Sequence, residues 1–246
     1  MNLRNRGLIL VVLATLIIAL VIMFPARVAY RLASNPLIAM SGIEGTVWSG
    51  SAREFSTNGV YLRDLSWDLQ PLSLLGGKAA YAISGSPVPG FFESKVAIGL
   101  GGKLVLYELT ASLPLAMFES AAKIQGIRGT ASLQFERLEI ARGRATAMDG
   151  NINVGDLVVP LVSRSSLGGY RAEFFTQNNG VVASVEDTDG VIDLAGSLQL
   201  NADKSYAFIG QIAAKSGTPD DLARQMRYLP KGDQPGQHEI RLEGSF

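Results

Sequence analysis

The sequence predicts a mainly β fold: a single N-terminal transmembrane helix, followed by an elongated, curved antiparallel β-sheet domain with few short helices. Three observations predict it. Residues 7–24 are apolar and uncharged. The rest of the chain alternates apolar and polar residues in short segments interrupted by Gly, Asn, Asp or Ser, the pattern of antiparallel strands joined by tight turns. A Gly-Ile-x-Gly-Thr frame occurs at 42–46 and again at 126–130, which indicates a repeated structural unit.

The N-terminal segment GLILVVLATLIIALVIMF, residues 7–24, is long enough to cross a membrane once as a helix. At about 1.5 Å per residue it spans roughly 27 Å, close to the thickness of the hydrocarbon core of a bilayer. The alternative is a cleaved signal peptide, which would have a shorter apolar region followed by a small-x-small cleavage site. The following residues, FPARVAYRLA, place Arg27, Tyr30 and Arg31 around every possible site. We therefore expect a retained anchor.

Positive charges flank the span on both sides, so its orientation is weakly specified. Arg4 and Arg6 precede it and Arg27 and Arg31 follow it. Together with the free amino group, the positive-inside rule favours a cytoplasmic N-terminus. The expected organisation is a cytoplasmic segment at 1–6, a transmembrane anchor at 7–25, a juxtamembrane segment at 26–34 and a β-rich periplasmic domain at 35–246.

Strand patterns dominate the chain after the anchor. Alternation is clearest in KLVLYELTASL (103–113), VVASVEDTDGVIDLAGSLQL (181–200) and HEIRLEGSF (238–246). In the second of these, Asp189-Gly190 separates two alternating runs, which predicts a hairpin.

Helix signals are few. Residues 114–124 and 219–229 each begin with a Pro that suits the first turn of a helix. In the second segment the Thr218 hydroxyl is expected to cap the helix, and two Asp residues suit the positive end of the helix dipole. A third, shorter helix is predicted at 36–40, also opened by Pro.

The repeated frame is explained by a unit of helix, glycine stop and strand meander. In both copies a helix that begins at Pro would end at Gly42 or Gly126 in a left-handed conformation, which costs Gly nothing. The repeats lie near 36–113 and 114–217, with a partial copy at 218–246. Such units would stack into one continuous sheet; a two-sheet sandwich is the alternative.

Glycines inside the predicted strands indicate bulges or places where a backbone or an aromatic ring lies close. They are Gly45, Gly50, Gly85, Gly129, Gly143 and Gly196. Trp48 is a candidate to cover such a glycine. We expect Trp48 and Trp67 to be core aromatics on the concave face, the alternative being an exposed surface for a partner or lipid.

Composition excludes several function classes. Lys+Arg and Asp+Glu are equal at 22 each, so no long-range field attracts nucleic acid. With no Cys and a single His, His238, the chain cannot assemble a thiolate or His-rich metal site. We expect His238 to be a surface strand residue rather than a member of a catalytic triad. No cofactor is expected.

Three further motifs have simpler interpretations than chemistry. GLGGKL (99–104) resembles a phosphate loop, but Lys103 is followed by Leu and no helix pattern follows, so a hairpin turn is predicted. The segment Asp187–Gly190 carries part of a calcium loop, but Val185 occupies the place of the first Asp, so a turn is again predicted. A catalytic carboxylate pair is not indicated, because the strand carboxylates alternate with apolar residues as solvent-facing positions would: Asp64, Asp68, Glu136 and Glu139.

Three stretches carry a resemblance to a known family: the span running into FPARVAYRLA, GTVWSGSA (45–52) and LSWDLQPLSLL (65–75). With them, the chain resembles the protein N family of the bacterial type II secretion system. The tail and the repeated unit are also similar to the broader AsmA-like group of anchored envelope proteins. The resemblance implies a single-pass inner-membrane protein with its bulk in the periplasm, no enzymatic activity, and other secretion-system proteins as partners. The motif positions, expected to be structural, are Gly45, Thr46, Trp48, Gly50, Trp67 and Pro71.

Two functions follow from the resemblance. In the first, the protein is an assembly or scaffold component that contacts other secretion proteins through a sheet edge, the helices or the span. In the second, the concave apolar face holds the acyl chains of a lipid, as in an AsmA-like lipid-handling protein. The placement of the helices separates the two. Helices over the concave face would favour the scaffold, whereas an open apolar trough would require a ligand or partner.

Overall fold

The computed structural model describes residues 3–33, 38–57, 60–76, 79–87, 89–99, 102–119, 124–141, 143–177, 180–232 and 234–245. Side chains are described for the same residues except those of 3–11, 60 and 74–76.

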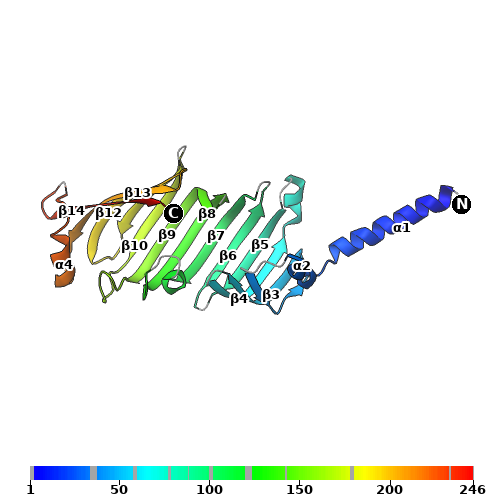
Figure 1. Cartoon of the computed structure of the whole chain (residues 1–246), viewed down its shortest axis with the longest axis horizontal. Helices are drawn as coiled ribbons and strands as arrows, with labels where there is room; N and C mark the ends of the chain where they lie inside the picture. The colour runs from blue at the N-terminus through cyan, green and yellow to red at the C-terminus, as the bar shows by residue number, and fades with distance from the viewer. Residues whose placement is uncertain are drawn as a thin grey trace.

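One antiparallel sheet of fourteen strands makes up most of the described chain (Figure 1). From β3 onward each strand pairs with the next in sequence, and β1 and β2 both pair with β3. This single meander confirms the predicted mainly β class, and the alternative of a two-sheet sandwich is wrong. The strands are β1 (Ile38–Ser41), β2 (Glu44–Gly45), β3 (Ser49–Thr57), β4 (Val60–Leu69), β5 (Ala79–Ser86), β6 (Phe91–Ile98), β7 (Leu104–Pro114), β8 (Arg128–Ala141), β9 (Arg144–Val158), β10 (Tyr170–Gln177), β11 (Gly180–Asp187), β12 (Ile192–Asn201), β13 (Ser205–Ala214) and β14 (Gln237–Ser245).

Helices lie at the two ends of the sheet (Figure 1). At the β1 end, α1 (Leu3–Ile22) projects away and α2 (Ala26–Ala33) follows it; α4 (Asp220–Met226) lies at the β14 end. Two 3-10 helices, η1 (Pro71–Gly76) and η2 (Leu115–Phe118), interrupt the meander. Within the part of the chain that the structure describes, no helix combines the length and apolarity needed to cross a membrane. The predicted span begins among residues 7–11, whose side chains lie outside the described set, and it stays a prediction.

The short helix predicted at 36–40 is wrong. Residues 34–37 lie outside the described residues, and from Ile38 the chain forms β1. Ile38 pairs with Thr57 and Ser41 with Glu54. The backbone groups of this segment are therefore hydrogen-bonded to β3 instead of within a helix. The pairing partner is far along the chain, which is why the local Pro signal is misleading.

The other two helix predictions are partly right. At 114–124, β7 continues to Pro114, η2 then covers Leu115–Phe118, and 120–123 lie outside the described residues. At 219–229 a helix forms as α4, but Thr218 does not cap it. The Thr218 hydroxyl instead donates to the carbonyl of Val191 at 2.5 Å and accepts the N–H of Lys215.

Both glycines of the repeated frame have a positive φ in both copies. Gly42 and Gly126 have φ of 61° and 72°, and Gly45 and Gly129 have φ of 83° and 129°. A Cβ on Gly45 would lie 2.5 Å from the carbonyl oxygen of Ser49. A Cβ on Gly129 would lie 2.7 Å from that of Gly155. The frame therefore requires Gly for both conformation and space, although the first copy follows a strand instead of a helix. Gly143, predicted inside a strand, occupies the turn after β8.

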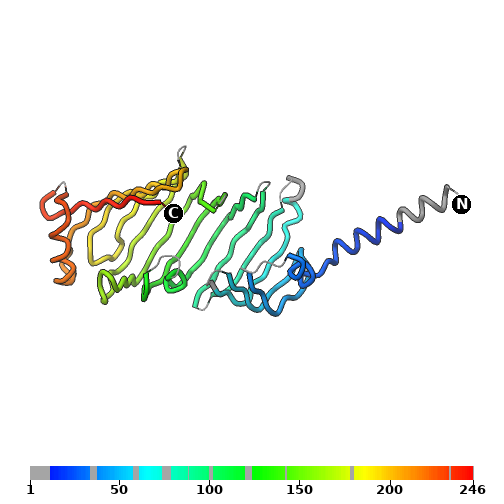
Figure 2. The backbone as a smooth tube through the Cα atoms, in the orientation of Figure 1, coloured from blue at the N-terminus to red at the C-terminus, as the bar shows by residue number. Residues whose placement is uncertain are grey.

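Bulges bend the sheet near its centre. β7 carries an extra residue at Glu108, whose φ is 51°, and β8 carries one between Phe135 and Arg137. Extra residues of this kind increase local twist and bend the strand. In Figure 2 the tube of β13 and β14 runs across the direction of the central strands, as this accumulated twist requires.

Among the described side chains, three separate hydrophobic clusters hold the sheet. The central cluster is built around Leu109, Phe135 and Phe174, and the rings of the two Phe residues lie 5.7 Å apart. The N-terminal cluster joins Ala26 of α2 to the sheet: Ala26, Ile43, Ala52 and Leu65. The C-terminal cluster joins α4 to the sheet: Leu167, Ile212, Leu222 and Met226.

Candidate functional site: an apolar trough and its junction with the N-terminal helix

Two rows of directly paired residues cross the sheet on its hollowed face. The first row contains Leu109, Phe135, Gly150, Phe174, Ala183, Leu198, Phe208 and Leu242. The second contains Phe92, Ala111, Leu133, Ile152, Ala172, Val185, Gly196, Gly210 and Ile240. Neither row includes a polar side chain. We call the hollow above them the trough.

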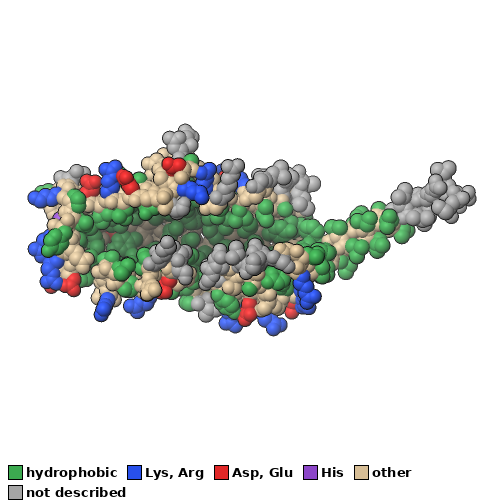
Figure 3. Space-filling view, in the orientation of Figure 1, with side chains coloured by type: hydrophobic (Ala, Val, Ile, Leu, Met, Phe, Trp, Pro, Cys, Tyr) green, Lys and Arg blue, Asp and Glu red, His purple; other side chains and the backbone are tan. Residues whose placement is uncertain are grey.

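The trough is long and no described helix covers it. Figure 3 looks into it and shows hydrophobic side chains between two rims that carry the charged groups. At about 4.8 Å per strand, the first row alone spans roughly 34 Å. Because α2 and α4 lie at the ends of the sheet, the helices do not fill the trough. Leu109, Phe135, Phe174 and Ala183 of the first row are buried in the central cluster. The accessible apolar surface of the trough therefore comes from the half-buried residues of the two rows and from Leu242. A long apolar hollow of this kind is typical of a binding site.

Aromatic rings lie against glycines at two places on the sheet, one beside the N-terminal cluster and one in the trough. A Cβ on Gly50 would meet Trp67 Cζ2 at 2.6 Å, and one on Gly196 would meet Phe208 Cζ at 2.7 Å. Gly196 thus has the predicted role, whereas the ring over Gly50 belongs to Trp67 and not to Trp48. A side chain at either glycine would occupy the space that the ring takes.

The motif positions meet at the junction between α1 and the sheet, which we define as Phe24, Pro25, Thr46–Trp48 and Trp67. Thr46 organises a tight turn: its backbone N–H donates to the carbonyl of Ser49 at 2.8 Å, and its hydroxyl accepts the N–H groups of Trp48 and Ser49, each at 3.2 Å. Pro25 forms a bridge with Thr46, and the N–H of Val47 donates to the carbonyl of Phe24 at 3.1 Å.

The two Trp residues hydrogen-bond to different parts of the junction. Trp48 Nε1 donates to the carbonyl of Val21 at the end of α1, at 2.7 Å. Trp67 Nε1 donates to the carbonyl of Thr46 at 3.1 Å, and its ring packs on the N-terminal cluster. Trp67 is therefore the predicted core aromatic, whereas Trp48 fastens the helix. The turn brings Gly45, Thr46, Trp48, Gly50 and Trp67 together; Pro71 lies apart, at the start of η1.

Glu139 differs from its predicted place in solvent. It alternates with Leu138 and Ile140, so it lies on the face opposite the trough, but it is buried. Its carboxylate accepts Lys103 Nζ at 2.5 Å and pairs with Arg137. Burial alone would raise the pKa of Glu139, but the hydrogen bonds from Lys103 and Arg137 outweigh burial and lower it. Asp64, Asp68 and Glu136 are exposed as predicted.

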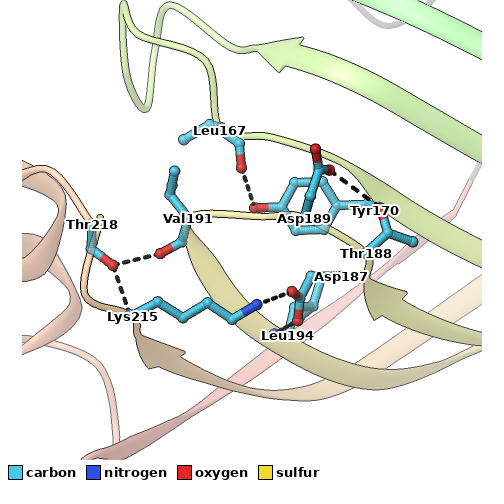
Figure 4. A network of polar contacts seen from close by, with 9 residues as sticks. All are labelled: Leu167, Tyr170, Asp187, Thr188, Asp189, Val191, Leu194, Lys215 and Thr218. Atoms are coloured by element: carbon cyan, nitrogen blue, oxygen red, sulfur yellow. Dashed lines mark hydrogen bonds and ion pairs between the residues drawn. The ribbon is translucent and has the colours of Figure 1, made fainter.

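A polar network closes the loops beside α4 (Figure 4). Asp187 pairs with Lys215 and accepts the N–H of Leu194 at 2.9 Å. Burial would raise the pKa of Asp187, and these partners lower it. Tyr170 donates to the carbonyl of Leu167 at 3.1 Å. The carboxylates of the predicted calcium-like turn thus have internal partners, and Asp189 receives the hydroxyl of Thr188.

The remaining motifs have structural roles. In GLGGKL the N–H of Gly99 donates to the carbonyl of Lys103 at 2.8 Å, which confirms the turn between β6 and β7. His238 lies half-buried on β14, with Nδ1 at 3.3 Å from the carbonyl of Leu229. Among the described side chains, no group of three or more His, Cys, Asp or Glu residues is placed to hold a metal ion.

Comparison with known proteins identifies the family. The family model for the type II secretion system (T2SS), protein N, matches residues 36–241. The chain belongs to this family. It is 24% identical to the type II secretion system protein N of Vibrio cholerae serotype O1, with 99% of each chain covered. It is 20% identical to the type II secretion system protein N of Aeromonas hydrophila, with 92% of each covered. No solved structure matches significantly.

Membership of the family connects the chain with type II secretion. The match covers residues 36–241 and thus includes the turn at Thr46–Trp48, Trp67 and the strands of the trough as far as Arg241 in β14. The residues of the trough were only partly foreseeable. The alternation of apolar and polar residues predicts that each row residue lies on the apolar face of its strand. The strand register, which aligns these residues across β7 to β14, is seen only in the folded sheet.

Proposed function

We propose that this chain is a non-enzymatic assembly component of the type II secretion system. Residues 7–25 anchor it in the inner membrane, residues 1–6 are cytoplasmic, and the β-rich domain at 35–246 lies in the periplasm. Family membership supports the link with secretion. The apolar, uncharged stretch at 7–24 supports the anchor.

The observation that carries the proposal is the open trough, fastened to α1 at the junction. Its two apolar rows have no polar side chain that could pair with an extended peptide backbone, and an unpaired buried backbone is costly. A helix satisfies its own backbone, so the apolar face of an amphipathic partner helix can lie in the trough. We therefore expect the occupant to be a helix of another secretion-system protein of the inner-membrane platform or periplasm.

Lipid handling is the second candidate, and the same trough favours it. Acyl chains need no hydrogen-bonding partner, and burying each CH₂ group contributes about 0.8 kcal/mol. The AsmA-like resemblance of the sequence points to the same use. In this alternative the charged rims would face the headgroups while the two rows hold the chains.

One experiment separates the two candidates. A photo-crosslinking amino acid replaces Leu198, which lies in the first row, in the full-length chain in cells. The matched control replaces Ser197, the exposed neighbour that faces away from the trough. If the trough holds a protein, the Leu198 position gives adducts with other secretion-system proteins and the Ser197 position does not.

The lipid alternative gives a different result. The Leu198 position would yield lipid adducts, and the purified chain would retain phospholipid at a fixed stoichiometry by native mass spectrometry. Ile98 lies on β6 six residues after Phe92, so its side chain is on the trough face, and it is 57% exposed. Ile98→Asp would then reduce retention while the melting temperature stays unchanged. We expect protein adducts and a lipid-free chain. Stoichiometric phospholipid would overturn the assembly role of the trough, and absence of lipid in both measurements would exclude lipid handling.

A further inference from the structure

The open edges of a sheet attract other strands unless they are protected. At the β1 edge, Tyr30 of α2 supplies the protection: its hydroxyl donates to the carbonyl of Ile38 at 3.0 Å and accepts the N–H of Met40 at 3.1 Å. At the other edge, the first half of β14 is covered by residues 230–232. The N–H of Gly232 donates to the carbonyl of Gln237, and the N–H of Glu239 donates to the carbonyl of Pro230, each at 2.9 Å.

The second half of β14 has no such cover. Because Gln237 and Glu239 direct their backbone groups away from β13, strand alternation directs those of Arg241 and Glu243 the same way. Among the described residues, these outward N–H and carbonyl groups have no backbone partner. The side chain of Leu242 is 56% exposed on the trough face. Arg241 and Glu243 are exposed on the other face, where Arg241 Nε donates to Glu243 Oε1 at 2.8 Å.

This open segment is complementary to itself. We propose that Ile240–Gly244 pairs antiparallel with the same segment of a second copy of this chain, about a two-fold axis at Leu242. In that register Arg241 of each copy lies opposite Glu243 of the other. The backbone N–H and carbonyl groups of both residues point away from β13, as a hydrogen-bonded pair between the two copies requires. The charges are complementary at both crossings, and Leu242 meets Leu242 at the centre.

The pairing joins the two troughs. The first apolar row ends at Leu242, so it continues into the first row of the second copy, and Ile240 comes opposite the small Gly244. Pro230, already bonded to Glu239, limits the new contact to Ile240–Gly244. The contact is therefore shorter than an ordinary dimer interface, and the association is weak and depends on concentration.

Exchanging the charges of Arg241 and Glu243 tests the proposed register between two copies, in full-length chains held in membranes. Arg241→Glu places two carboxylates opposite each other in the homodimer, and Glu243→Arg does the same with two guanidinium groups. Each variant alone should dimerise about tenfold more weakly than the natural chain, because attraction becomes repulsion at two crossings. Mixing the two variants restores both complementary pairs and should restore the dimer. A mixture that stays as weak as the single variants would overturn the proposal.

Disulfide trapping gives a second measurement, since the chain has no Cys of its own. Leu242 would face itself at about 4.5 Å between Cα atoms, which suits a disulfide. Leu242→Cys should therefore give a crosslinked dimer under mild oxidation. Arg241→Cys and Glu243→Cys should not crosslink alone but should do so when mixed.

Two controls keep the trapping specific. Tyr228→Cys, at a residue that is 91% exposed and outside the Ile240–Gly244 pairing segment, should remain monomeric. Adding Arg241→Pro to Leu242→Cys removes one outward N–H without touching a bond to β13, so the sheet is retained while crosslinking falls. Crosslinking of Leu242→Cys only to another protein, or no crosslinking at all, would contradict pairing between copies.

Discussion

At the scale of single residues, buried polar groups are the clearest departure from strand alternation. Glu139 lies on the outer face as its alternation with Leu138 and Ile140 predicts. However, Lys103, just before β7, lies over it, and Arg137 reaches it from two residues away. The sequence shows which face a strand residue takes. It does not show what a distant turn places above that face.

Glu139→Gln should lower the free energy of unfolding by about 1–3 kcal/mol at pH 7, because a buried site loses its charge-assisted hydrogen bonds. The matched control is Glu136→Gln, an exposed neighbour on the same strand, which should change it by less than about 0.5 kcal/mol. Urea unfolding of the two variants measures both values. Equal values would show that Lys103 and Arg137 contribute nothing through Glu139.

The pH dependence of the same variant has a defined sign. The pKa of Glu139 is lowered in the folded protein, so its stabilisation is complete above the ordinary Glu pKa of about 4.3 and is lost as pH falls through the lower, folded pKa. Glu139→Gln should therefore flatten the fall in unfolding free energy below about pH 4.3.

At the scale of elements, the two Trp residues of the junction have different roles. Trp48→Phe removes the bond to the carbonyl of Val21 while leaving the N-terminal cluster intact, so it should loosen α1 with little change in the melting temperature. Trp67→Phe removes the bond to Thr46 and empties part of that cluster, so it should lower the melting temperature. Proteolysis between α1 and α2, compared with thermal unfolding, distinguishes the variants. If both variants lowered the melting temperature equally and were cleaved at the same rate, the two Trp residues would not have different roles.

Elements that depend on local signals were predicted well, and those that depend on distant partners were not. Asp189-Gly190 gives a hairpin, and α4 begins after Pro219, because turn residues and Pro act within a few positions. The 36–40 segment carries the same Pro signal but becomes β1, because β3 and Tyr30 supply partners that its sequence does not contain. The same holds for Thr218, whose hydroxyl is drawn to Val191 across a loop.

At the scale of the whole molecule, the sheet is a one-dimensional stack in which each strand contacts its neighbours. In the sequence, the alternation of apolar and polar residues predicts a sheet with an apolar face. Whether the trough is open depends on where the helices pack, and α2 and α4 lie at the two ends of the sheet. The three clusters are likewise separate along the stack. A stack of this kind opens in local units rather than all at once.

Substitution in the central cluster tests this organisation. Phe135 is 3% exposed and contacts Phe174, so Phe135→Ala should cost about 3–5 kcal/mol. Because the clusters are separate, amide exchange should accelerate in β7 to β11 and change much less in β3 and β4. Ile212→Ala, in the C-terminal cluster, should instead accelerate exchange in β12 to β14 and α4. Uniform acceleration across the chain by either variant would mean that the sheet opens as a single cooperative unit.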